Sequence, residues 1–310
     1  MNFNGRSIIS INDFTTEEIL FILKTADRFL KQQHPNLLDG KIVSMLFFEP
    51  STRTRLSFES AMHRLGGKVI GFAEPGATSV KKGENLTDTV RMAASYSDVI
   101  IIRHPLEGAA RLASEVSSVP VINGGDGANQ HPTQTFLDLF TVMKTQTKLF
   151  NKKGKTLNVG IAGDLKYGRT VHSLSSALAR FNSRLFFISP PSLRMPGNYL
   201  NELADKGIPY SEHDTIEDVI QELDILYATR IQEERFPDPI EFMRVKNAYI
   251  IRNNHLKNAK KNLKIMHPLP RVSEIHREVD NSPCAYYFQQ AANGIPVRQA
   301  LLALINGKLQ

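Results

Sequence analysis

The sequence predicts an α/β protein with two parallel-sheet domains, a cleft between them and long helices that bridge them. From Lys41 onward, short apolar runs alternate with longer amphipathic segments, which is the pattern of strands buried on both faces and of the helices that cover them. At 310 residues the chain is long enough for two domains. A basic segment at 147–156 (TKLFNKKGKT) interrupts the alternation near the middle of the chain and predicts the linker.

The first domain is expected to cover residues 1–150. It opens with an amphipathic helix at 15–30 (TTEEILFILKTADRFL). The helix after the first strand keeps Phe58, Ala61 and Met62 at helical spacing and stops at a Gly-Gly pair. Strands are predicted at 41–49, 68–73, 99–104 and 119–123, and further helices at 51–67, 86–96, 107–117 and 132–146.

The second domain is expected to cover residues 151–291 and to repeat the same rhythm. Strands are predicted at 157–164, 184–189, 224–230 and 262–267, and helices at 170–181, 199–207 and 215–223. The C-terminal helix, 292–310, is strongly apolar on one face. We therefore expect it to pack back against the first domain and to complete it.

Charge and cysteine content narrow the class of protein. Cys284 is the only cysteine, which excludes an internal disulfide and leaves no cysteine pair for a zinc site. No stretch is apolar enough to cross a bilayer and the first residues lack the layout of a signal peptide, so a cytoplasmic protein without membrane contact is expected. The net charge of +7 suits either nucleic acid or small acidic substrates. The densest basic run, 257–264 (KNAKKNLK), has no interleaved aromatics; we interpret it as a solvated helical face, which favours small anions.

The segment PSTRTR, 50–55, places two arginines where a helix is expected to begin. The helix dipole disfavours a cation there by about 0.3–1 kcal/mol, so a bound anion is the simplest compensation. The unpaired N–H groups of the first turn, the hydroxyls of Ser51, Thr52 and Thr54, and an arginine side chain together suit a phosphate. An ordinary capped helix with its arginines in water is the alternative.

Further arginines recur at the carboxyl ends of predicted strands. These are Arg103, Arg169, Arg230 and Arg271. Open α/β sheets bind ligands at that edge. Each arginine alone fits an ordinary surface position, but together they predict one cleft for substrates with several negative charges.

Three loops carry additional polar groups. The Gly-bearing loop 79–85 (SVKKGEN) can close over an anion or reach a neighbouring subunit, or else be a mobile solvated loop. In HPTQ, His131 can donate to a carbonyl oxygen and Gln134 can hold an amino group, although plain helix capping fits as well. In HPLPR, 267–271, rigid strand-end backbone can present carbonyl oxygens to a ligand.

Seven motifs together resemble a known family. In chain order they are FFEPSTRTR, KKGE, RHP, HPTQ, GDLKYGRT, TRIQ and HPLPR. This series is similar to the aspartate/ornithine carbamoyltransferase family over nearly the whole chain, and the combination is highly specific. Ornithine-specific members typically carry a cysteine where this chain has Pro268, so the sequence resembles the aspartate-specific branch. Arg230 and Lys82 support the same choice, because they would repel the ammonium group of ornithine and attract a dicarboxylate.

The resemblance implies that the first domain binds carbamoyl phosphate. The residues implied to bind its phosphate are Ser51, Thr52, Arg53 and Thr54. Its carbonyl oxygen is implied to accept from Thr54, Arg103 and His131, with Arg103 also reaching the phosphate. Its amino group is implied to be held by Gln134 and by the backbone carbonyls of Pro268 and Leu269.

The resemblance further implies that the second domain binds aspartate. Its two carboxylates are assigned to Arg169, Arg230 and Gln232. Closure of the two domains is assigned to Glu49, Arg235 and Arg271. Ser79 and Lys82 are expected to arrive from an adjacent subunit, with Lys81 as the alternative to Lys82.

The implied reaction is direct attack of the aspartate α-amine on carbamoyl phosphate, through a tetrahedral intermediate. The resemblance implies a homotrimer with shared active sites and leaves room for a separate zinc-bearing regulatory chain. No HExxH or GxSxG motif occurs, which leaves zinc hydrolysis and the serine-esterase layout without support. The implied reaction needs neither a metal nor a cofactor, and no nucleic-acid partner is expected. Two alternatives stay open: an ornithine-type carbamoyltransferase, and a non-catalytic anion- or nucleic-acid-binding protein.

Overall fold

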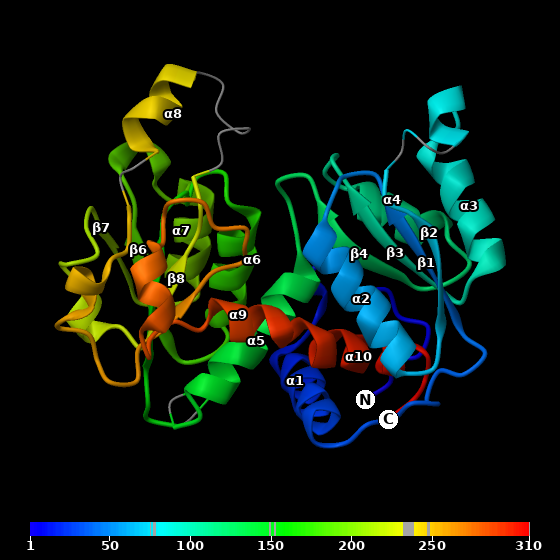
Figure 1. Ribbon diagram of the computed structural model, residues 1–310, viewed down its shortest axis with the longest axis horizontal. Coiled ribbons are helices and arrows are strands. Elements are labelled where there is room, and N and C mark those ends of the chain that lie inside the picture. Colours follow the sequence, from blue (N-terminus) through cyan, green and yellow to red (C-terminus); the bar gives the residue numbers. More distant parts are fainter. Residues whose placement is uncertain are drawn as a thin grey trace. The chain divides into compact units, whose positions relative to one another are not determined.

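The computed structural model describes residues 1–74, 76, 79–148, 150–151, 153–231, 239–246 and 249–309. The chain divides into two compact units, Met1–Phe140 with Asn293–Gln310 and Thr141–Ala292. Each unit contains one parallel sheet with helices packed against it (Figure 1), so the predicted architecture of two parallel-sheet α/β domains is confirmed. The cleft expected between them stays a prediction.

The first unit is built on a four-stranded sheet in the order β2-β1-β3-β4, with every pairing parallel. Its strands are β1 (Ile42–Phe47), β2 (Lys68–Phe72), β3 (Val99–His104) and β4 (Val121–Asp126). Because all four strands run the same way, their carboxyl ends meet at one edge. The segments after β1, β3 and β4 therefore emerge side by side.

Six α-helices formed by described residues belong wholly or partly to the first unit. They are α1 (Thr16–Lys31), α2 (Thr52–Arg64), α3 (Leu86–Tyr96), α4 (Ala109–Val116), α5 (Pro132–Thr145) and α10 (Gly294–Ile305). The C-terminal α10 is buried all round and packs against α1 and α2, which explains its high apolar content. It lies in the first compact unit. The chain enters the second unit within α5.

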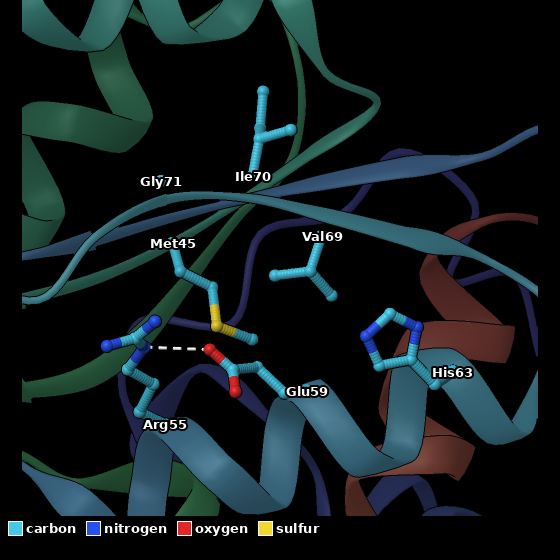
Figure 2. A pocket seen from close by; sticks show the side chains of 7 residues that line it. All are labelled: Met45, Arg55, Glu59, His63, Val69, Ile70 and Gly71. Carbon is cyan, nitrogen blue, oxygen red and sulfur yellow. Dashed lines mark hydrogen bonds and ion pairs between the residues drawn. The ribbon is translucent and has the colours of Figure 1, made fainter.

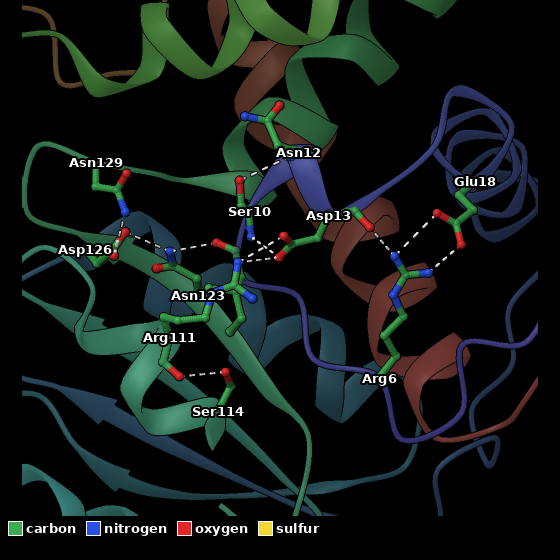
Figure 3. Close-up of polar contacts among 11 residues, drawn as sticks. Arg6, Ser10, Asn12, Asp13, Glu18, Arg111, Ser114, Asn123, Asp126 and Asn129 are labelled. Atoms are coloured by element: carbon green, nitrogen blue, oxygen red, sulfur yellow. Dashed lines mark hydrogen bonds and ion pairs between the residues drawn. The ribbon is translucent and has the colours of Figure 1, made fainter. Parts of the chain in front are cut away.

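The N-terminal segment braces the carboxyl end of β4 (Figure 3). The Asn123 N–H donates to the Ile8 carbonyl at 2.8 Å, as in a parallel ladder. The Asn123 side chain donates to the carboxylate of Asp126, also at 2.8 Å and fully buried. Arg111 on α4 then holds Asp13 at 2.8 Å. These contacts fix the turn that leads from β4 into α5.

The second unit is built on a five-stranded parallel sheet in the order β7-β6-β5-β8-β9. Its strands are β5 (Leu157–Ala162), β6 (Ser183–Ile188), β7 (Tyr210–His213), β8 (Ile225–Ala228) and β9 (Lys264–Met266). Its further helices are α6 (Arg169–Leu178), α7 (Gly197–Asp205), α8 (Pro239–Val245) and α9 (Tyr287–Ala292). The adjacent strands β5, β8 and β9 are those whose carboxyl ends lead into GDLKYGR, TRIQ and HPLPR.

Two local predictions in the second unit are wrong, and one strand was not predicted. The helix expected at 215–223 is a run of turns that ends in a short 3-10 turn, Ile220–Glu222. Ile216 and Val219 are buried, because turns place residues three apart on one side just as a helix does. The strand β7 was not predicted, since its sequence YSEH is half-exposed and lacks an apolar run. The basic run 257–264 is not a helix: it consists of turns and irregular backbone as far as Leu263, and Lys264 begins β9.

No helix among the residues described here combines the length and the apolar character needed to span a bilayer.

Candidate active site

The start of α2 lacks the usual groups that satisfy a helix N-terminus. Ser51 occupies the N-cap position, yet its side chain makes no capping hydrogen bond, and the first turn contains no acidic residue. The start of α1 differs, since Thr15 and Glu18 form a reciprocal capping box there. The N–H groups and positive dipole end of α2 are thus left for an external anion.

The two arginines in this turn have different surroundings. The Arg55 Nε donates to Glu59 at 2.7 Å, and both residues line a pocket of about 230 Å³ beside the edge strand β2 (Figure 2). Arg53 does not line this pocket, and partial loss of water around its guanidinium lowers its pKa. The structure therefore separates the pair: Arg55 belongs to a local ion pair, and Arg53 is the candidate for an anion.

Arg103 lies at the end of β3 and is only 9% exposed. Its Nη1 donates to the Gly124 carbonyl at 3.1 Å, and its Nη2 forms an ion pair with Glu49 at 2.9 Å. Register places Arg103 beside Phe47, the last residue of β1. A largely buried guanidinium is thus held between the carboxyl ends of β1 and β4.

Thr54 and His131 lie close to the same strand ends. A Cβ on Gly124 would sit 3.6 Å from the Thr54 methyl group, which places the buried Thr54 against the end of β4. His131 is also buried, and its carbonyl accepts the Thr135 N–H at 3.1 Å in the first turn of α5. Segments that follow β1, β3 and β4 thus carry the polar groups of this unit to one edge of the sheet.

In the second unit, Arg169 and Arg230 follow neighbouring strands. Arg169 is the first residue of α6, after the turn that ends β5, and Arg230 comes directly after Thr229 at the end of β8. The Thr229 N–H donates to the Ala162 carbonyl at 2.9 Å, and a Cβ on Gly163 would lie 2.2 Å from the Thr229 carbonyl oxygen. Only glycine allows the two strand ends to approach this closely.

The HPLPR turn follows β9, next to β8 in the sheet. Leu269 has a φ of +56°, a left-handed conformation that is uncommon outside glycine. Arg271 pairs through both of its terminal nitrogens with Asp280 and also donates to the Tyr287 hydroxyl at 3.1 Å. The hydrogen bond from Arg271, the largest cause, lowers the pKa of Asp280.

Comparisons with known proteins identify the family. The aspartate/ornithine carbamoyltransferase carbamoyl-P binding domain matches residues 6–144, and the Asp/Orn binding domain of the same family matches residues 155–305. The chain belongs to the aspartate/ornithine carbamoyltransferase family. Among curated carbamoyltransferases, the aspartate carbamoyltransferase catalytic subunit of Thermococcus onnurineus is 56% identical, over 100% of both chains. That of Bacteroides fragilis is 55% identical over 98% of this chain and 97% of its own.

Solved structures of the carbamoyltransferase family agree with this assignment. The catalytic subunit of M. jannaschii aspartate transcarbamoylase superposes with a TM-score of 0.87 at 49% identity, covering 96% of each chain. Aspartate transcarbamoylase from Trypanosoma cruzi, in complex with carbamoyl phosphate and aspartate, gives a TM-score of 0.90 at 38% identity. That match covers 97% of this chain and 96% of the other.

Not all predicted carbamoyltransferase residues are brought together within one unit. Ser79 and Lys82 begin and end a short exposed 3-10 turn, Ser79–Lys82, that precedes α3. Gln232 and Arg235 lie outside the described residues. Glu49, predicted to act in closure, pairs with Arg103 of its own unit, and Arg271 is likewise paired within its own unit. The closure roles of both stay predictions.

Sequence reasoning missed a buried polar chain behind Gln134 in this carbamoyltransferase. The Gln134 amide nitrogen donates to Asp138 at 2.9 Å, which turns the amide oxygen toward other donors. Burial lowers the pKa of Arg298 on α10 to about 10, with Asp138 acting in the opposite direction. Arg298 also lies over the Phe58 ring, 4.8 Å from its centroid. The available signal was one arginine within the apolar run IPVRQALLALI.

Metal-ligating side chains do not gather in the part of the chain described here: no three His, Cys, Asp or Glu residues lie close enough to hold an ion.

Proposed function

We propose that the chain transfers the carbamoyl group of carbamoyl phosphate to the α-amine of L-aspartate, giving N-carbamoyl-L-aspartate and phosphate for pyrimidine biosynthesis. The observation that carries this proposal is the uncapped, arginine-bearing start of α2 beside the buried Arg103. It is an anion site in the first of two units whose sequences match a carbamoyltransferase along their whole length. The T. cruzi enzyme was crystallised with these same two substrates.

The first unit binds carbamoyl phosphate in this proposal. The phosphate is held by the hydroxyls and N–H groups of Ser51, Thr52 and Thr54 and by the guanidinium of Arg53. Arg103 reaches both the phosphate and the carbonyl oxygen, to which His131 also donates. The free amide oxygen of Gln134 accepts from the carbamoyl amino group, an assignment supported by the hydrogen bond that ties its amide nitrogen to Asp138.

The second unit binds aspartate. Arg169 and Arg230 follow adjacent strands and match two carboxylates in charge and geometry. Gln232 is assigned to the same carboxylates. The carbonyls of Pro268 and Leu269 at the end of the next strand complete the carbamoyl amino-group site.

The chemical step needs alignment and charge stabilisation. The deprotonated amine forms a bond to the carbamoyl carbon and gives a tetrahedral oxyanion. The carbon–oxygen bond to phosphate then breaks, and the amine nitrogen loses a proton. Donors already in place at Arg103, His131 and Thr54 stabilise the oxyanion, where one such donor contributes about 2.7–4 kcal/mol. Holding both reactants together supplies much of the remaining acceleration.

The functional assembly in this proposal is a cytoplasmic homotrimer. Ser79 and Lys82 would complete the site of an adjacent subunit, which fits their exposed position on a turn at the surface of their own unit. A separate regulatory chain, if one binds, would carry its own zinc, because this chain has a single cysteine. Glu49, Arg235 and Arg271 are assigned to domain closure.

An assay of the purified chain alone tests the proposal. With aspartate, we expect carbamoyl aspartate and phosphate in equal amounts, and light scattering should give three times the 34.8 kDa chain mass. Phosphate release with ornithine instead would identify an ornithine-type enzyme. Inactivity with both amines, together with strongly salt-dependent nucleic-acid binding, would favour the non-catalytic alternative.

A further inference from the structure

The HPLPR turn is organised around a fully buried histidine. The Leu269 N–H donates to the His267 Nδ1 at 2.8 Å, and the His267 Nε2 lies 2.7 Å from Glu274. The second carboxylate oxygen of Glu274 accepts the N–H groups of Val272 and Ser273, each at 3.0 Å. One imidazole and one carboxylate thereby tie together the backbone from 267 to 274.

The helix α9 also contacts the histidine. The backbone N–H of His267 donates to the side-chain oxygen of Gln290 on α9 at 2.7 Å, and Gln290 is completely buried. The Glu274 carbonyl in turn accepts the Ile251 N–H at 2.8 Å. The backbone of both His267 and Glu274 is therefore hydrogen-bonded to other parts of the second unit.

The segment that this arrangement supports is strained. A leucine at φ +56° is disfavoured, because its side chain crowds the backbone there. Such a conformation persists only where neighbouring contacts hold it, and strained backbone concentrates at functional sites. The contact that holds Leu269 is the hydrogen bond from its own N–H to His267.

The protonation state of His267 follows from its partners. A backbone N–H can only donate, so Nδ1 must keep its lone pair and the single ring proton sits on Nε2, facing Glu274. Burial lowers the pKa of His267; the hydrogen bond and charge of Glu274 oppose this shift, while Arg271 and Arg230 add to it. A neutral ring at pH 7 is consistent with that direction. Protonation of Nδ1 would break the bond to Leu269.

We propose that His267, oriented by Glu274, is a positioning residue for carbamoyl transfer: its Nδ1 holds the Leu269 backbone so that the carbonyls of Pro268 and Leu269 face the carbamoyl amino group. This inference rests on the proposed function. It adds His267 and Glu274, which orient the groups that touch substrate. His267 acts through the backbone and does not itself contact the reactants.

The test compares the variants His267→Ala and His267→Asn in steady-state kinetics. His267→Ala leaves the Leu269 N–H without an acceptor, and we expect kcat/KM for carbamoyl phosphate to fall about 10- to 100-fold, while KM for aspartate changes less than about twofold. Asn offers an oxygen near the position of Nδ1, so His267→Asn should recover most of this loss. Glu274→Gln keeps an oxygen for Nε2–H, so its loss of kcat/KM should be smaller than that of Glu274→Ala.

The control is His276→Ala, at a side chain that is 43% exposed. Its kinetic constants should match those of the parent.

The possible outcomes separate this inference from the proposed function. A parent chain that makes no carbamoyl aspartate contradicts the proposed function and the inference with it. An active parent with a His267→Ala variant within twofold of it contradicts only the inference. If His267→Ala lowers kcat/KM equally for carbamoyl phosphate and for aspartate, and His267→Asn does not recover the loss, the histidine is purely structural. That result also overturns the inference. If His267→Ala does not fold, the same comparison is made with His267→Asn and Glu274→Gln. The inference is overturned unless kcat/KM for carbamoyl phosphate falls more than KM for aspartate changes.

Discussion

Replacing Arg53 by alanine should lower kcat about 10²- to 10³-fold, the usual effect of removing one charged donor from a preorganised anion site. Arg53 is the guanidinium at the start of α2 that lies outside the local Arg55–Glu59 pair, and the turn contains no acid to neutralise it. The variant would leave the N–H groups of the turn in place, so carbamoyl phosphate should still bind, but more weakly. Initial rates at saturating aspartate, over a range of carbamoyl phosphate concentrations, give both kcat and KM for carbamoyl phosphate.

The matched control for Arg53 is on the same helix. Arg64 lies in the last turn of α2, is exposed and donates to Ser60 at 3.2 Å. Arg64→Ala changes the net charge equally and should keep kcat within about twofold, because surface substitutions of this kind usually have small effects. A turnover of Arg53→Ala within a few-fold of the parent would show that the start of α2 is not the phosphate site.

Replacing Arg230 by alanine should weaken aspartate binding specifically. A hydrogen bond to a charged group contributes about 1.5–3 kcal/mol, so KM for aspartate should rise about 10- to 150-fold. KM for carbamoyl phosphate should change little, since its phosphate is assigned to the other unit. Aspartate titrations at saturating carbamoyl phosphate measure the effect.

Arg184 provides the control within the same sheet. It lies near the amino end of β6, is 44% exposed and pairs loosely with Glu222 at 3.6 Å. Ligands bind at the carboxyl edge of such sheets, so Arg184→Ala should leave both KM values near those of the parent. Equal effects of Arg184→Ala and Arg230→Ala would mean that general charge, and not position, attracts aspartate.

The fold was predictable from the sequence wherever burial dictated composition. Strands such as β3 and β5 are covered on both faces and therefore appear as apolar runs, and α3 was predicted with the bounds it has, 86–96. The edge strand β7 lacks that signal because it is only half-covered. The failure at 215–223 has a different origin. The spacing of apolar residues shows which side chains face the core, but it does not distinguish a helix from a series of turns.

The candidate site was predictable as far as strand ends could be located. Arg103 ends a strand and Arg169 and Arg230 follow strands. The sheet orders place these strands beside others that carry candidate residues. Helix position alone could not distinguish Arg53 from Arg55, and only the family resemblance favoured Arg53. The folded turn adds the physical reason, since Arg55 pairs with Glu59. Electrostatic interactions between residues far apart in the chain, such as Asp138 with Arg298, could not be predicted from the sequence either.

A crystal structure of this chain with N-(phosphonacetyl)-L-aspartic acid, the ligand bound in a T. cruzi aspartate transcarbamoylase structure, would test the whole account most directly. We predict that the phosphonate lies at the start of α2, within about 2.7–3.0 Å of donors on Arg53 and Arg103. The two carboxylates should meet Arg169 and Arg230. A ligand bound at another place, or these four arginines turned toward solvent while it is bound, would contradict the account.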